Sequence, residues 1–181
     1  MNTKTPFSYW LSIAPFTGFK LGKYTRPTYV GERETPTDLN ALTMQQLIEL
    51  SQVSDSNESM YAVCECVLNA TRADIARAPA AEVVRFVGWV FAEVERINAL
   101  FGKMENKPTA QEQRAGVSRL DFGLFGLIDW YARRMGISDH DEVMRTPWLR
   151  LYKCLDMDVK RQAFERKLQS IRNEDIKKQR K

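Results

Sequence analysis

The sequence has little of the chemistry that most enzymes use. It contains one histidine in 181 residues, and it has no Walker loop, no GxSxG elbow and no HExxH motif. Most hydrolytic mechanisms rely on histidine or on one of these motifs. The sequence therefore predicts a protein that is not an enzyme and that uses no cofactor.

Cysteine is also scarce. The three cysteines, Cys64, Cys66 and Cys154, are an odd number without the spacing of a disulfide scaffold, which is typical of a reducing compartment. A structural zinc site needs four ligands, but only Cys154 and His140 could join the Cys64-x-Cys66 pair, and residues two apart on a helix point about 200° apart. We therefore predict buried thiols and no metal site.

Long apolar runs are missing as well. No stretch approaches the roughly eighteen uncharged apolar residues of a membrane span. The apolar run from Phe7 to Ile13 is short, is broken by Ser8 and Ser12, and makes a poor signal peptide. A composition of 44% hydrophobic and 28% charged residues is ordinary globular usage. These features predict a soluble cytoplasmic protein without membrane contact.

The positive charge is concentrated at the C-terminus. Residues 160–181 contain nine Lys or Arg and three acids, a net +6, whereas the whole chain carries +4, so the remaining residues sum to −2. The basicity thus belongs to a tail, and the high isoelectric point is weak evidence for a nucleic-acid-binding domain.

The first 38 residues predict an extended aromatic arm. They hold four of the seven prolines and lack a sustained helical period, so no helix is expected before Thr37. A short hairpin is possible, with apolar residues Phe16, Phe19, Leu21, Tyr24, Tyr29 and Val30 and turns at Gly18, Gly22 and Gly31. The arm could also clasp a neighbour, but packing on its own domain is favoured because it would shelter the rings from water.

Residues 39–176 predict one helical domain, followed by a basic tail at 177–181. Three pairs predict capped helix starts, namely Thr43 with Gln46, Asp55 with Glu58, and Thr109 with Glu112. A central helix of about 34 Å is expected from Pro79 to Phe101. Its inner stripe comprises Val83, Phe86, Val87, Val90, Val94, Ile97 and Phe101. The fold class is all-α, an irregular bundle of about six or seven helices.

Helical patterning continues from Thr109 to Gly136, with a break or close helix packing at DFGLFG because glycine destabilises helices. The triplet Asp121-Phe122-Gly123 is a chance match to a kinase motif, since its companion motifs are missing. Asp139-His140-Asp141-Glu142 could bind a metal, but a helix start is the favoured interpretation. Thr146-Pro147 begins the last helix. Apolar residues recur along it at Leu149, Tyr152, Leu155, Val159, Phe164, Leu168 and Ile171.

The segment LFGLIDWYARRMG combines a Trp-Tyr pair with two arginines. One interpretation is a helix buried on two sides, and Trp148 is expected to behave as a core residue. The other is a recognition groove, because Trp, Tyr, Met and Arg are enriched at binding hot spots. Tyr131 and Tyr152 are expected to keep their hydroxyls near water. The predicted partner-binding residues are Trp130, Tyr131, Arg134, Trp148 and Tyr152.

The order of LTMQQLIEL, AEVVRFVGWVFAEVERINALF and AGVSRLDFGLFGLIDWYARRMGISDHDEVMRTPWLRLYKCLDMD resembles the tail assembly chaperones of long-tailed phages, over roughly residues 38 to 172. The match lies in size, helical content, the Trp-Tyr segment and the Pro-Trp start of the last helix. The aromatic arm departs from that pattern. The resemblance implies a holdase, in the host cytoplasm, that coats the tape measure protein while tail tube subunits assemble around it.

The alternative is a small nucleic-acid-binding or regulatory protein whose tail, RKLQSIRNEDIKKQRK, contacts phosphates. A basic run at a chain end is more often a solvated helix terminus, so nucleic acid is the less favoured partner. Self-association is a further alternative.

Overall fold

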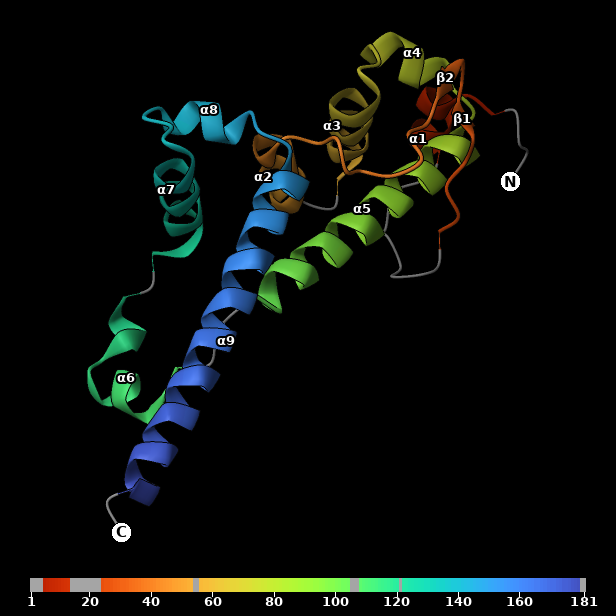
Figure 1. Cartoon of the computed structure of the whole chain (residues 1–181). Helices are drawn as coiled ribbons and strands as arrows, with labels where there is room; N and C mark the ends of the chain where they lie inside the picture. Colours follow the sequence, from red (N-terminus) through yellow and green to blue (C-terminus); the bar gives the residue numbers. More distant parts are fainter. Residues whose placement is uncertain (1–4, 14–23, 54–55, 105–107, 121, 180–181) are drawn as a thin grey trace. The chain divides into compact units, whose positions relative to one another are not determined.

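The computed structural model describes residues 5–13, 24–53, 56–104, 108–120 and 122–179. It is mostly helical, as predicted, and within these residues it contains nine α-helices and one two-stranded hairpin (Figure 1). The chain forms two compact units, Met1–Ala99 and Leu100–Lys181. We call them the N-terminal and C-terminal units and describe each by itself. The predicted boundaries after residues 38 and 176 stay a prediction.

The predicted non-helical arm is wrong in one respect, because α1 spans Phe7–Ile13. With seven residues this helix is too short to show a period in the sequence, and tertiary contacts support it. The Phe7 N–H donates to the Ala78 carbonyl (2.9 Å), and the Ala80 N–H donates to the Thr5 carbonyl (2.8 Å). The Phe7 ring is fully buried and lies 5.2 Å from the Tyr61 ring. This part of the arm therefore packs on its own unit.

A hairpin follows, formed by β1 (Tyr29–Val30) and β2 (Arg33–Glu34) in antiparallel register. Its turn contains Gly31 at φ +60°, a conformation that glycine adopts without steric cost, so the predicted turn there is confirmed. The other predicted hairpin residues, except Tyr24 before β1, lie outside the described residues: Phe16, Gly18, Phe19, Leu21 and Gly22.

Three short helices come next, α2 (Met44–Gln52), α3 (Asn57–Leu68) and α4 (Arg72–Arg77). The predicted capping box of Thr43 and Gln46 is present at α2. The N-cap of α3 is Ser56, one residue after the predicted Asp55, which lies outside the described residues. A second capping box, Thr71 with Asp74 at α4, was not predicted because Asp takes the position usually held by Glu or Gln.

The helix α5 (Ala80–Gly102) supplies much of the N-terminal core. Six of the seven residues predicted for its inner stripe are buried, and Phe101 is half-buried. Gly88 is also buried, and a Cβ atom there would lie 2.5 Å from the Tyr24 ring, so that ring packs directly on the helix backbone. Only the last three residues of α5 belong to the C-terminal unit.

The C-terminal unit contains α6 (Ala110–Arg114), the 3₁₀ helix η1 (Val117–Arg119), α7 (Gly123–Met135), α8 (His140–Met144) and α9 (Trp148–Gln179). The break predicted at DFGLFG is confirmed, because α7 begins at Gly123, whose φ of +51° is a left-handed conformation. A further break at Gly116, with φ +85°, was not predicted. The helix α1 and the separation of α6 from α7 raise the number of α-helices in the described residues above the expected six or seven. Asp121 of the kinase-like triplet lies outside the described residues.

Local signals in this unit are otherwise confirmed. Thr109 and Glu112 form the predicted capping box of α6, Gly136 closes α7 at φ +68°, and Asp139 caps α8. The last helix, α9, extends to Gln179, so part of the predicted tail is helical. None of the helices in the described ranges is long and apolar enough to span a membrane.

Candidate functional site

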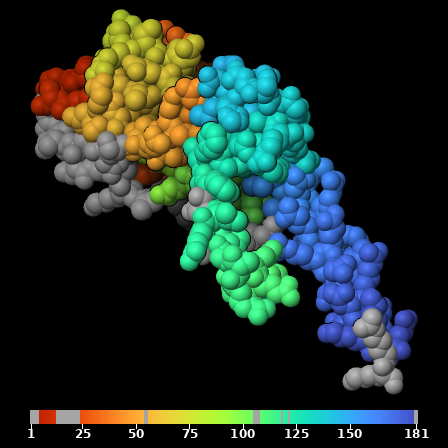
Figure 2. Space-filling model, turned by 90° about the vertical axis from the view of Figure 1, so that its left-hand side faces the viewer, coloured from red at the N-terminus to blue at the C-terminus, as the bar shows by residue number. Residues whose placement is uncertain are grey.

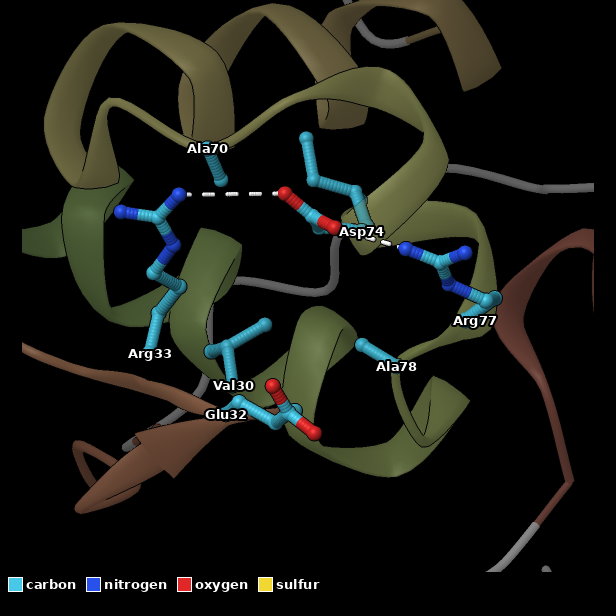
Figure 3. A pocket seen from close by; sticks show the side chains of 9 residues that line it. Val30, Glu32, Arg33, Ala70, Asp74, Arg77 and Ala78 are labelled. Carbon is cyan, nitrogen blue, oxygen red and sulfur yellow. Dashed lines mark hydrogen bonds and ion pairs between the residues drawn. The ribbon is translucent and has the colours of Figure 1, made fainter.

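The N-terminal unit contains a pocket of about 520 Å³ between the hairpin turn and α4 (Figure 3). Its walls combine small apolar side chains with charged ones. It is lined by Val30, Gly31, Glu32, Arg33, Ala70, Asp74, Ile75, Arg77 and Ala78.

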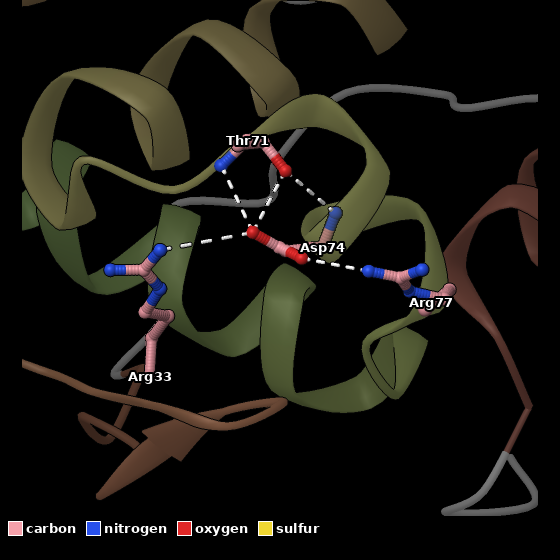
Figure 4. A network of polar contacts seen from close by, with 4 residues as sticks. All are labelled: Arg33, Thr71, Asp74 and Arg77. Atoms are coloured by element: carbon pink, nitrogen blue, oxygen red, sulfur yellow. Dashed lines mark hydrogen bonds and ion pairs between the residues drawn. The ribbon is translucent and has the colours of Figure 1, made fainter.

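Three of the charged side chains that line this pocket, Arg33, Asp74 and Arg77, interact with one another (Figure 4). The Asp74 carboxylate accepts hydrogen bonds from the Thr71 hydroxyl (2.8 Å) and from Arg77 (2.8 Å), and it lies 3.8 Å from the Arg33 guanidinium. The hydrogen bonds from Thr71, and then the one from Arg77, hold the pKa of Asp74 below its ordinary value. Because both arginines contact the same carboxylate, this network connects the hairpin to α4, and its ionic groups already have partners.

The five predicted partner-binding residues lie in the C-terminal unit, on α7 and α9. Trp130 and Tyr131 are adjacent, with ring centroids 6.2 Å apart. Arg134 places its guanidinium 5.8 Å from the Trp130 ring and forms an ion pair with Asp158 of α9. These contacts fix the second half of α7 against α9.

Two of the predicted residues are core residues. Trp148 and Tyr131 are each 1% exposed. The expectation that Tyr131 keeps its hydroxyl near water is therefore wrong. Burial raises the pKa of Tyr131, and the nearby Arg150 opposes this rise. Neither ring can contact a partner unless the unit rearranges.

Tyr152 is half-buried and contributes to the same core. The Phe101 ring, in the last turn of α5, lies 6.1 Å from Trp148 and 5.6 Å from Tyr152, in edge-to-face arrangements. Such pairs stabilise by about 0.5–1.5 kcal/mol beyond their area burial. This aromatic group holds the start of α9.

The exposed apolar side chains are a feature that the sequence did not reveal. The C-terminal unit buries six apolar residues among those described: Ile128, Tyr131, Ala132, Val143, Trp148 and Leu151. Nine of its large apolar side chains are exposed instead: Leu120, Phe122, Leu124, Phe125, Met135, Met157, Phe164, Ile171 and Ile176. In the described part of the N-terminal unit, the exposed large apolar side chains are Tyr9 and Tyr29.

The first group of these residues forms what we call the α7 patch, namely Leu120, Phe122, Leu124 and Phe125. Phe122 and Phe125 are 68% and 63% exposed. A Cβ atom at Gly126 would lie 2.8 Å from the Phe122 side chain, so Phe122 lies over the helix backbone there. Phe125 contacts the His140 ring edge-to-face at 5.1 Å. Four exposed large apolar side chains within six residues of one another favour an interaction site here.

A second group lies on α9, whose last turns extend beyond α6, α7 and α8 (Figure 2). At 100° per residue, Met157, Phe164, Leu168 and Ile171 fall within a strip about 60° wide, which we call the α9 stripe. The buried Trp148 and Leu151 lie roughly on the opposite face of the helix. The apolar residues that recur along α9 in the sequence thus belong to two faces, and only one of them is covered within the unit.

Comparisons of the chain with protein-family models, with curated proteins and with solved structures find no match. The candidate site is therefore defined by geometry alone. It comprises the α7 patch and the α9 stripe.

Proposed function

We propose that this chain is a non-enzymatic chaperone that binds apolar helical segments of a partner protein and keeps them from aggregating. The supporting observation is the set of nine exposed large apolar side chains in the C-terminal unit. The resemblance to phage tail assembly chaperones suggests the tape measure protein as the partner.

Removing the exposed Leu and Phe side chains of the α7 patch from water is the favourable term in partner binding, and the free-energy cost of association opposes it. A chaperone must bind reversibly, because its client is handed on to assembling subunits.

A nucleic-acid-binding role is the second candidate, supported by the net +6 of residues 160–181. Phosphate contacts would use the basic side chains and leave the apolar ones in water. Bases could stack on Phe122, Phe125 or Phe164, but aliphatic side chains such as Leu124 and Ile171 offer no stacking plane. Helical protein segments use both kinds of apolar side chain, so they fit this surface better.

The proposal can be tested with a helical tape-measure segment that aggregates alone. Light scattering of this segment should fall when the full chain is added. The double variant Phe122→Ser with Phe125→Ser should lose most of this protection while keeping its circular dichroism spectrum, because both rings are exposed.

Tyr9→Ser provides the matched control, since Tyr9 is an exposed ring of the N-terminal unit, 60% accessible. It should protect the segment as well as the wild type does. Full protection by the Phe122 and Phe125 double variant would contradict the proposal.

A further inference from the structure

The helix α9 has two differently used faces. Its covered face includes Trp148 and Leu151, and further along Arg166 forms an ion pair with Glu112 of α6 (3.5 Å). Arg166 lies on the same side of the helix as Trp148, at 100° per residue. The segment α6 thus pairs with the side of α9 that faces away from Phe164 and Ile171.

The α9 stripe remains open on the other side. Met157, Phe164 and Ile171 are 55%, 65% and 47% exposed, and Leu168 is half-buried. These four residues extend over about four turns, a length that suits a side-by-side helix. Asp175 lies on the same line beyond Ile171 and ends the apolar strip.

Basic residues border the stripe on both sides. Lys160, Lys167 and Lys178 fall along one edge, and Arg161 and Arg172 fall along the other, as helical spacing dictates. Lys160 forms an ion pair with Asp156 at 2.7 Å. The other four basic residues form no ion pair within the described ranges. The α9 stripe is therefore an apolar strip with basic residues along both of its edges.

We infer that the α9 stripe binds an amphipathic helix of a partner protein whose apolar face is bordered by acidic residues. This inference rests on the proposed function and specifies the chemistry of the helical segment that is bound. In paired helices, residues bordering the apolar seam select the partner through opposite charges. Glu or Asp beside the partner's apolar face would thus meet Arg161, Lys167, Arg172 and Lys178.

The same charges disfavour two other occupants. In a second copy of this chain, each α9 would bring its own positive edges, and like charges placed together weaken association. The phosphates of a nucleic acid would pair with the basic residues at the edges, but Phe164 and Ile171 would stay largely exposed to water. The acidic amphipathic helix is the occupant that uses both the apolar seam and its borders.

Three synthetic helical peptides with one shared apolar face and Glu, Gln or Lys at the bordering positions provide the test. Fluorescence anisotropy would measure their binding to the full chain. We expect the Glu peptide to bind about tenfold or more tightly than the Gln peptide, and the Lys peptide to bind weakest. The preference should shrink at high salt because exposed charges are screened.

Variants assign this binding to the stripe. Phe164→Ser combined with Ile171→Ser should abolish it without changing the circular dichroism spectrum. Lys167→Glu should lower the affinity for the Glu peptide about three- to tenfold, since charges at the rim of an interface contribute modestly to the binding free energy. Lys177→Glu makes the same charge change on the opposite face of α9 and should have no effect.

The other outcomes are distinct. Equal affinity for the three peptides would overturn the acidic preference, even if the tape-measure segment still stays soluble. Dimers in sedimentation that the Phe164 and Ile171 variant disrupts, without peptide binding, would assign the stripe to a second copy. Duplex DNA binding with a steep salt dependence and no peptide binding would assign it to nucleic acid.

Unchanged light scattering of the tape-measure segment, with the Glu peptide still bound, would overturn the proposed function alone.

Discussion

Among the described residues, the N-terminal unit buries most of its large apolar side chains, whereas the C-terminal unit leaves many of them in solvent. Twenty-one apolar residues are buried in the described part of the first unit, against six in that of the second. The second unit nevertheless exposes nine large apolar side chains. Two units of similar chain length thus use apolar residues differently, one to build a core and the other to present a surface.

This difference has a consequence for stability. Regions with few buried apolar contacts open at a lower free energy than the core of the same protein. Tyr131, Trp148 and Leu151 supply much of the C-terminal core, so each carries a large share of it. We therefore expect the C-terminal unit to open first.

The largest effect is expected for Trp148→Ala. Trp-to-Ala changes in a core cost about 3–5 kcal/mol, and the small C-terminal core has little else to offset the loss. Hydrogen exchange should show lost protection in α7 and in the first half of α9, with α5 still protected over Val83–Val94. Equal loss of protection in both units would show that they unfold together, and would contradict the expectation that the C-terminal unit opens first.

A smaller effect is expected for Gly88→Ala. The new Cβ atom would lie 2.5 Å from the Tyr24 ring, and this crowding should destabilise the N-terminal unit by about 1–3 kcal/mol in urea unfolding. Gly102→Ala is the control, because nothing lies within 4 Å of a Cβ atom there and alanine is the better helix former. Similar unfolding curves for the two variants would contradict the packing of Tyr24 on α5.

The smallest effect concerns two equivalent capping boxes. Thr43→Ala should cost about 1 kcal/mol, because α2 buries Met44, Leu47 and Leu50 in the N-terminal core. Thr109→Ala should cost less than about 0.5 kcal/mol of global stability, since α6 buries no residue. Thermal unfolding of the two variants would compare them directly. An equal or larger loss of stability for Thr109→Ala would show that α6 contributes more to the stability of the fold than the exposure of its side chains indicates.

The sequence predicts those features of the fold that depend on neighbouring residues. Caps at Thr43, Thr109 and Asp139 follow from hydrogen bonds within one turn, and Gly136 follows from the left-handed conformation at a helix end. The α5 stripe is also predictable because it keeps a regular period over many turns. Each of these signals is local or periodic.

Other features depend on contacts between distant residues. The helix α1 is supported by Ala78 and Tyr61, which the sequence of the arm cannot indicate. Helical spacing along α9 shows that apolar residues recur, but not which face of the helix is covered, so it does not indicate that Phe164 is exposed. Tyr131 was expected to keep its hydroxyl near water, but the whole residue is buried. The candidate site was missed because exposure is a property of the whole unit.

The central claim is that the exposed apolar surface of the C-terminal unit contacts a helical partner. Hydroxyl-radical footprinting of the full chain, with and without a helical tape-measure segment, tests this claim most directly. We expect oxidation to fall at Phe122, Phe125 and Phe164 and to stay constant at Tyr9 and Tyr29. Unchanged oxidation of the three phenylalanines, or protection confined to the two tyrosines, would contradict the account.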